Sequence, residues 1–204
     1  MLQEDLKRYR IILASGSPRR QRLLGELELE FEVLSRDDLD EGYPAELAKD
    51  EIPGYLAEKK SYQFMPEVPG DTLLITADTI VWLNGRVIGK PADRQDAVRI
   101  LSELSGSVHE VLTGVCLRSD TVKRIFTASS LVYFSVLTAE EIEYYIEKFR
   151  PFDKAGAYGI QEWIGYIGIE KIEGSYFNVM GLPVQKLYSE LKEFASSQVR
   201  KLKS

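Results

Sequence analysis

The chain has few of the side chains that form disulfides or bind soft metals. Its 204 residues include one cysteine, Cys116, and one histidine, His109. A single cysteine excludes an internal disulfide. A single histidine excludes a zinc site built on several histidines and gives little basis for a catalytic triad, so we interpret both residues as structural. Any bound metal is expected to be a hard divalent cation, Mg²⁺ or Mn²⁺, held by carboxylate oxygens.

Long apolar runs are missing as well. No segment approaches the roughly 20 apolar residues that cross a bilayer. Residues 1–10 are polar and charged and lack the apolar core of a signal peptide. We therefore expect a cytoplasmic protein with no membrane partner. The net charge of −6 argues weakly against broad nucleic-acid binding, which needs a basic face. It still permits a small anionic substrate, because a few clustered cations suffice locally.

The composition is that of a folded protein, with 44% hydrophobic and 28% charged residues. The length suits one domain, or two lobes that share a cleft. Strand and helix patterns alternate along the chain, several hairpins are expected, and no repeat or flexible linker is visible. These features predict an α/β fold with a mixed β-sheet and flanking helices.

The expected elements follow from apolar periodicity and from capping and turn residues. Thr138 and Glu141 form a capping-box pattern, and Asn84-Gly85 predicts a tight hairpin turn. Ser17 is expected to cap a helix with Pro18 in its first turn. The expected strands cover residues 10–15, 31–34, 72–77, 80–83, 86–88, 108–118, 123–135 and 163–169. The expected helices begin at residues 18, 52, 93, 138 and about 183, and those from 52 and 138 end at 64 and 149.

The segment Ser15-Gly16-Ser17-Pro18-Arg19-Arg20 is a candidate phosphate-binding loop. A strand ends and a helix begins there, so unpaired backbone N–H groups favour an anion. Two serine hydroxyls and two guanidinium groups lie at the same place, and arginine pairs with phosphate through a planar fork. The alternative is an ordinary capped surface helix with two solvated arginines.

Asp78 is a candidate catalytic carboxylate, because a charge between two apolar runs is costly unless it is paired or binds a metal. It also follows a strand, where ligands of α/β sheets bind. The alternative is a turn aspartate between two strands.

Lys90 is a further candidate and follows the predicted hairpin in a stiff Gly-Lys-Pro loop. Asp40 and Glu41 are candidate metal ligands, although acidic runs and helical lysines such as Lys60 are more often solvated.

The small-residue segment 153–161 is a third candidate. Its glycines and alanines let a ligand approach the backbone closely. Lys154 offers a cation, and Gln161 offers an amide that can both donate to and accept from a base. The alternative is an ordinary glycine-rich loop.

Together these segments resemble the Maf family of nucleoside triphosphate pyrophosphatases. The resemblance runs from about Ile11 to the final helix. The matching strings are LASGSPRR at 13–20, ADTIV at 77–81, GKP at 89–91, LSG with HxVxTG within 104–114, DKAGAYGIQ at 153–161 and GLP at 181–183.

The resemblance implies one Maf-like domain over residues 1–204, with a core of 10–201 and two lobes around a central nucleotide-binding cleft, as in Maf and ITPase-like proteins. It implies hydrolysis of a nucleoside triphosphate to the monophosphate and pyrophosphate, with Asp78 as the proton acceptor. Asp78, Asp40 and Glu41 would hold the metal, although matching the acidic pair requires one extra residue in this chain. The implied substrate-binding residues are Ser15, Arg19, Arg20, Lys60 and Lys90, and Lys154 is added as a further cation.

Base preference is also implied by the resemblance. Family members that prefer dTTP and UTP carry arginine, threonine and glutamine where this chain has Arg19, Thr79 and Gln161. The branch that acts on 7-methyl-GTP carries tryptophan, glutamine and glutamate there. We therefore predict a dTTP and UTP pyrophosphatase, with modified uridine triphosphates as further candidate substrates and a homodimer as the implied assembly. The alternatives are the same chemistry on another modified nucleotide, such as 7-methyl-GTP, or a nucleotide-binding regulator of cell division.

Overall fold

The computed structural model describes residues 2–36 and 38–201, with side chains up to residue 196. The strands are β1 Arg10–Ala14, β2 Glu32–Leu34, β3 Thr72–Leu83, β4 Arg86–Ile88, β5 Val108–Arg118, β6 Lys123–Phe134 and β7 Ile169–Glu173. The helices are α1 Leu2–Leu6, α2 Pro18–Gly25, α3 Ile52–Phe64, α4 Arg94–Leu104, α5 Ala139–Phe149, α6 Trp163–Gly168, α7 Tyr176–Met180 and α8 Val184–Lys201, with short 3-10 turns η1 Met65–Glu67 and η2 Ala155–Ala157.

The strands form a mixed sheet with the order β2-β1-β3-β5-β6-β7, and β4 pairs with β3. The pairs of β1 with β2 and with β3 are parallel, whereas β3–β4 and β6–β7 are antiparallel. The predicted α/β class with a mixed sheet and flanking helices is therefore confirmed. None of the described helices is long and apolar enough to span a bilayer.

The chain divides into two compact units. The first contains Met1–Asp78, Thr113–Ala128 and Gly181–Ser204, and the second contains Thr79–Leu112 and Ser129–Met180. Strands β3, β5 and β6 each contribute residues to both units. The division in β3 falls directly after Asp78.

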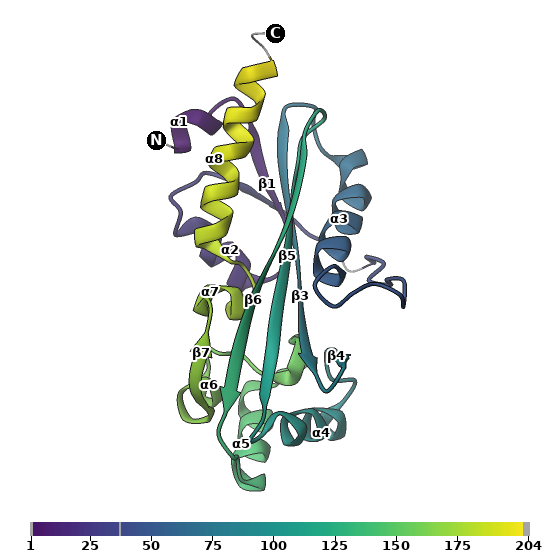
Figure 1. Ribbon diagram of the computed structural model, residues 1–204, viewed down its shortest axis with the longest axis vertical. Helices are drawn as coiled ribbons and strands as arrows, with labels where there is room; N and C mark the ends of the chain where they lie inside the picture. Colours follow the sequence, from purple (N-terminus) through teal and green to yellow (C-terminus); the bar gives the residue numbers. More distant parts are fainter. Residues whose placement is uncertain (1, 37, 202–204) are drawn as a thin grey trace. The chain divides into compact units, whose positions relative to one another are not determined.

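In the first unit, α3 lies on one face of the strands, and α8 with α1 beside it lies on the other (Figure 1). A cluster of buried apolar side chains joins α3 to the sheet and consists of Ile12, Ala14, Phe64 and Leu74. The bounds of α3 match the sequence prediction, because Pro53 fits the first turn and Leu56, Ala57 and Phe64 are buried.

Gly114 lets β5 approach the first turn of α3. A Cβ atom at Gly114 would lie 2.1 Å from the carbonyl carbon of Pro53 and 2.3 Å from the amide nitrogen of Gly54. Backbone atoms cannot move aside as a flexible side chain can. Glycine is therefore required for this contact between strand and helix.

The second unit contains the predicted hairpin and two capped helices. Asn84 and Gly85 both have positive φ, of 50° and 79°, which a tight two-residue turn requires. Asp93 caps α4 by accepting a hydrogen bond from the Asp96 amide (2.8 Å). Thr138 and Glu141 form the expected capping box of α5. These local predictions are confirmed.

Three local predictions are wrong. Segment 72–83 is one strand, so Asp78 lies within β3 and not at a strand end. The strand expected over 163–169 is instead helix α6, with Ile164 and Gly168 buried four residues apart and Tyr166 81% exposed. Ser17 occupies the N-cap position of α2, but its side chain makes no capping hydrogen bond. Helix α1 was not anticipated, although its Leu2 and Leu6 are buried at helical spacing.

His109 is buried in the second unit and is 1% exposed. Its Nε2 lies 2.7 Å from the Tyr158 hydroxyl, its ring packs against Phe134, and its Nδ1 is buried without a partner. Burial disfavours the imidazolium and lowers the pKa of His109 from 6.5 to about 4. The structural interpretation of this residue agrees with these contacts.

We expect His109 to make the fold less stable in mild acid. The unfolded chain takes up a proton near pH 6.5 and the folded chain only near pH 4, so the free energy of unfolding decreases as the pH falls between these values. The difference between the two pKa values of His109 corresponds to about 3 kcal/mol. Urea denaturation of the wild type and of His109→Gln at pH 7.5, 6 and 4.5 measures this contribution. An unchanged stability difference between the two proteins across this range would contradict it.

Candidate functional site

A buried lysine joins two carboxylates in the first unit. Lys60, on α3, is 7% exposed, and Asp78, on β3, is 9% exposed. The Lys60 ammonium group donates to Asp78 Oδ1 and, at 2.8 Å, to Glu41 Oε1. Buried charges of this kind are stable only when they are paired and hydrogen-bonded. The structure thus brings three of the predicted residues to one place.

The orientation of Asp78 follows from the alternation of β3. Side chains two residues apart on a strand share a face. Thr76 donates its hydroxyl to the Ala57 carbonyl of α3 (2.6 Å), and Asp78 contacts Lys60 one turn further along the same helix. The long strand therefore directs both polar side chains at α3.

The predicted acidic pair is divided between two lysines. Asp40 Oδ2 lies 2.6 Å from Lys59 Nζ, and its Oδ1 accepts from the Gly42 amide (2.8 Å). The Lys59 ammonium group, and then the Gly42 amide, hold the pKa of Asp40 below its ordinary value. Glu41, and not Asp40, contacts Lys60 in the structure.

Lys59 and Gln63 hold this acidic loop on α3 and were not singled out from the sequence. Lys59 donates to the Gly42 carbonyl (2.7 Å), and Gln63 Oε1 accepts from the Asp40 amide (3.0 Å). The two residues are four apart on the helix and so share a face. That spacing was visible in the sequence, but the acidic loop as their partner was not.

The candidate phosphate loop joins β1 to α2. Ser15 is 9% exposed, and its Oγ accepts from the Ser17 amide (3.3 Å). Gln21 Nε2 donates to the Ser15 carbonyl (3.2 Å), which fixes the loop on the first turns of α2. Ser17 occupies the N-cap position of α2, and its side chain makes no capping hydrogen bond.

Arg20 connects the phosphate loop to β3. Its Nη1 donates to the Ala77 carbonyl and its Nε donates to the Gly181 carbonyl, both at 2.8 Å. Burial lowers the pKa of the Arg20 guanidinium, the Asp78 carboxylate raises it, and neighbouring Arg19 lowers it. Arg20 is therefore held beside the residue preceding Asp78, within electrostatic reach of both the second arginine and the catalytic candidate.

The chemistry of these donors fits a hard divalent cation. Asp78 and Glu41 already share one positive charge, the Lys60 ammonium group. Mg²⁺ is commonly held by one or two carboxylates together with substrate phosphates and water. Among the described residues there is no group of three or more His, Cys, Asp or Glu side chains suited to a metal. Asp78 and Glu41 are two carboxylates of the kind that such a cation binds.

The remaining candidates lie in the second unit. Thr79 follows Asp78 in β3, and Lys90 is exposed in the loop after β4. The Gly89 carbonyl accepts from the Gly156 amide (3.0 Å), which ties the Lys90 loop to segment 153–161.

Two candidates lie within or next to that segment's buried contacts. Lys154 is 7% exposed and pairs with Asp153 Oδ1 (2.7 Å) and with Glu162 Oε1 (3.3 Å). Gln161 Oε1 is buried and has no hydrogen-bond partner.

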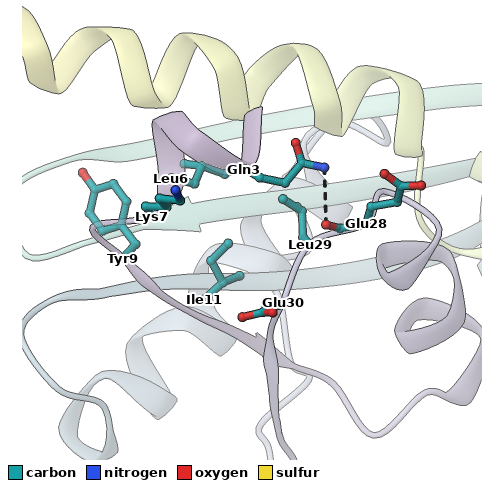
Figure 2. A pocket seen from close by; sticks show the side chains of 8 residues that line it. All are labelled: Gln3, Leu6, Lys7, Tyr9, Ile11, Glu28, Leu29 and Glu30. Carbon is teal, nitrogen blue, oxygen red and sulfur yellow. Dashed lines mark hydrogen bonds between the residues drawn. The ribbon is translucent and has the colours of Figure 1, made fainter. Parts of the chain in front are cut away.

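A pocket of about 310 Å³ in the first unit contains none of the predicted site residues (Figure 2). It is lined by residues of α1, of the connection from α1 to β1, of β1 and of the segment after α2, namely Gln3, Leu6, Lys7, Tyr9, Ile11, Glu28, Leu29 and Glu30. Gln3 Nε2 approaches the Glu28 carbonyl (3.4 Å) across it. The candidate chemistry therefore lies elsewhere, at α3, β3 and the β1–α2 loop.

The fold and these contacts define an α/β protein with a buried lysine–carboxylate centre and an arginine-rich loop between a strand and a helix. A family profile described as Maf-like protein matches residues 10–194, and the chain belongs to this family.

Curated relatives cover nearly the whole chain. A Bacteroides thetaiotaomicron protein is 54% identical over 93% of this chain and 98% of its own length. A Parabacteroides distasonis protein is 54% identical over 94% and 99%, and a Porphyromonas gingivalis protein is 52% identical over 95% and 98%. Each of these proteins is named dTTP/UTP pyrophosphatase.

Proposed function

We propose that this protein is a nucleoside triphosphate pyrophosphatase that hydrolyses dTTP and UTP to the monophosphate and pyrophosphate. The observation that carries the proposal is the identity of 54% to a dTTP/UTP pyrophosphatase over 93% of the chain. The contacts of the buried pair Lys60 and Asp78 with the exposed Glu41 support it, because cleavage of a phosphoanhydride requires both a proton acceptor and clustered positive charge.

The protein's own groups divide this chemistry between them. The Asp78 carboxylate accepts the proton of the water that attacks the α-phosphorus. Arg19, Arg20 and Lys60 stabilise negative charge on the phosphates and on the departing pyrophosphate. One charge pair at 4 Å contributes about 4 kcal/mol at an effective dielectric near 20, so several cations are required. We propose that Ser15 and the start of α2 bind a phosphate oxygen through O–H and N–H donors.

A divalent cation, Mg²⁺ or Mn²⁺, is part of the proposal, with Asp78 and Glu41 as its protein ligands. When bound, such a cation neutralises phosphate charge and lowers the pKa of water. In the second unit, Thr79 and Gln161 are proposed to select the base together with Arg19, and Lys90 and Lys154 are proposed to bind the substrate. The proposed setting is the cytoplasm, without a nucleic-acid partner, and the implied homodimer stays a prediction.

A pyrophosphate-release assay tests the function. We expect release from dTTP and UTP with Mg²⁺ or Mn²⁺, loss of release in EDTA and recovery when the metal is restored. The panel also includes CTP, GTP, ATP, modified uridine triphosphates and 7-methyl-GTP. Hydrolysis of 7-methyl-GTP without hydrolysis of dTTP or UTP would overturn the base preference. Nucleotide binding without any pyrophosphate release would instead indicate a regulatory protein.

A further inference from the structure

Gln161 lies in a turn whose two ends are held by one buried hydroxyl. The turn closes through a hydrogen bond from the Glu162 amide to the Gly159 carbonyl (2.9 Å). Tyr145, on α5, is fully buried. Its hydroxyl accepts from the Gly159 amide (3.0 Å) and donates to Glu162 Oε2. The residues on either side of Ile160-Gln161 are therefore fixed to the same atom.

The Glu162 carboxylate is held through both of its oxygens. Oε2 accepts from Tyr145, and Oε1 lies 3.3 Å from the ammonium group of Lys154. Lys154 is itself held by Asp153 Oδ1 at 2.7 Å. A charged acceptor bound by a hydroxyl and a buried cation keeps one orientation, because each lost contact would leave a buried polar group unsatisfied.

This carboxylate and the amide of Gln161 both lie against Gly159. A Cβ atom at Gly159 would lie 2.9 Å from Glu162 Oε2 and 3.0 Å from Gln161 Nε2, so both groups crowd the same side of that residue. A carboxylate only accepts hydrogen bonds. It therefore favours the NH₂ end of the Gln161 amide on its side and disfavours the carbonyl end. Gln161 Oε1 is the end left buried without a partner.

The orientation of a glutamine amide matters for base selection. Uracil and thymine present an N3–H donor beside the O4 acceptor, whereas cytosine presents an N3 acceptor beside an N4 donor. A glutamine that can rotate its amide by 180° satisfies either pattern, since it carries one donor group and one acceptor. Only a fixed amide discriminates between them, because the wrong base then leaves buried polar groups unpaired.

We propose that Tyr145 and Glu162 are positioning residues that fix the amide of Gln161 and thereby exclude cytosine nucleotides. This inference rests on the proposed function, in which Gln161 contacts the base. Tyr145 acts through Glu162 and does not itself touch the nucleotide. The orienting contacts are all in the second unit and join α5 to segment 153–162.

Tyr145→Phe tests the inference by removing one oxygen while keeping the ring that stacks on Phe149. We expect the ratio of kcat/KM for UTP over CTP to fall about tenfold, the size of one hydrogen bond to a charged group. Glu162→Gln should lower the same ratio, because an amide no longer distinguishes the two ends of Gln161. In a Gln161→Ala background, Tyr145→Phe should change the ratio no further.

Tyr144→Phe is the matched control. Tyr144 lies next to Tyr145 on α5, but its hydroxyl is at the surface and accepts from Lys148. Tyr144→Phe should keep the wild-type ratio of kcat/KM for UTP over CTP. Thermal unfolding of every variant identifies any that does not fold. If Tyr145→Phe does not fold, the UTP/CTP ratio of Glu162→Gln tests the inference. A UTP/CTP ratio within twofold of wild type in both Tyr145→Phe and Glu162→Gln overturns the inference, as does a further fall in the Gln161→Ala background.

Equilibrium binding of UMP and CMP separates this inference from the proposed function. If the wild type releases no pyrophosphate but prefers UMP, and Tyr145→Phe removes that preference, the proposed function fails and the positioning role holds. If the wild type hydrolyses UTP and Tyr145→Phe discriminates against cytosine as well as wild type does, the positioning role fails and the function holds. A wild type with no preference for uracil over cytosine overturns the positioning role.

Discussion

Asp78→Asn is expected to lower kcat for dTTP and UTP on the order of 10³-fold or more while leaving much of the nucleotide affinity. Loss of a general base alone typically lowers the rate about 10²- to 10⁴-fold. Loss of the carboxylate charge that pairs with Lys60 lowers the rate further. Arg20 keeps its contacts with main-chain carbonyls, so a phosphate-binding surface remains. Pyrophosphate release under saturating nucleotide, together with calorimetric nucleotide binding, measures both effects.

Asp71→Asn provides the matched control for this result. Asp71 directly precedes β3 and is exposed, so the same chemical change there should leave kcat within about twofold of wild type. Full activity in Asp78→Asn would exclude Asp78 as the proton acceptor. Equal losses in the two variants would indicate a general effect of charge and not a catalytic one.

Gly114→Ala is expected to destabilise the fold strongly, because the added methyl group meets backbone atoms of α3. The new Cβ would lie 2.1 Å from the Pro53 carbonyl carbon, so α3 or β5 must shift. Overpacking typically costs about 1–3 kcal/mol and occasionally more, and we expect at least the upper value because the obstacle is backbone. In a chain of this size, that corresponds to a decrease in Tm of roughly 6–12 °C.

Activity should fall with stability in Gly114→Ala, because α3 carries Lys60 and holds the acidic loop through Lys59 and Gln63. Gly25→Ala, at the end of α2, is the control, since its nearest neighbour would be Phe31 at an ordinary 4.0 Å. Thermal unfolding followed by circular dichroism compares the two. A Tm of Gly114→Ala within 2 °C of wild type would show that the close approach to α3 is not required.

Sequence patterns predicted those elements that local chemistry determines. The capping box of α5, the hairpin turn at Asn84-Gly85 and both ends of α3 depend on residues close together in the chain, and they are found as expected. Helix α6 was mistaken for a strand because its short apolar run fits both the helical and the strand periodicity. Its helical path depends on Gly165, where a Cβ would lie 1.9 Å from the Ile160 carbonyl oxygen.

The candidate site illustrates a different limit. Charge and position singled out Asp78, and the family resemblance added Lys60, but 18 residues separate them, and only the folded chain shows that they touch. The same holds for Glu41, which the sequence could not distinguish from Asp40, and for Tyr145, which was not singled out from the sequence. Long-range pairing decides these roles, whereas periodicity and capping carry only short-range information.

The register of β3 limits where insertions and deletions can be tolerated in this chain during evolution. Leu13 of β1 pairs with Ile75, and from there Thr76 and Asp78 both point at α3. One inserted or deleted residue between Ile75 and Asp78 would turn the carboxylate to the opposite face of the sheet and away from Lys60. Homologous proteins should therefore differ in this segment by substitution, and insertions and deletions should occur in the loops that flank the strand.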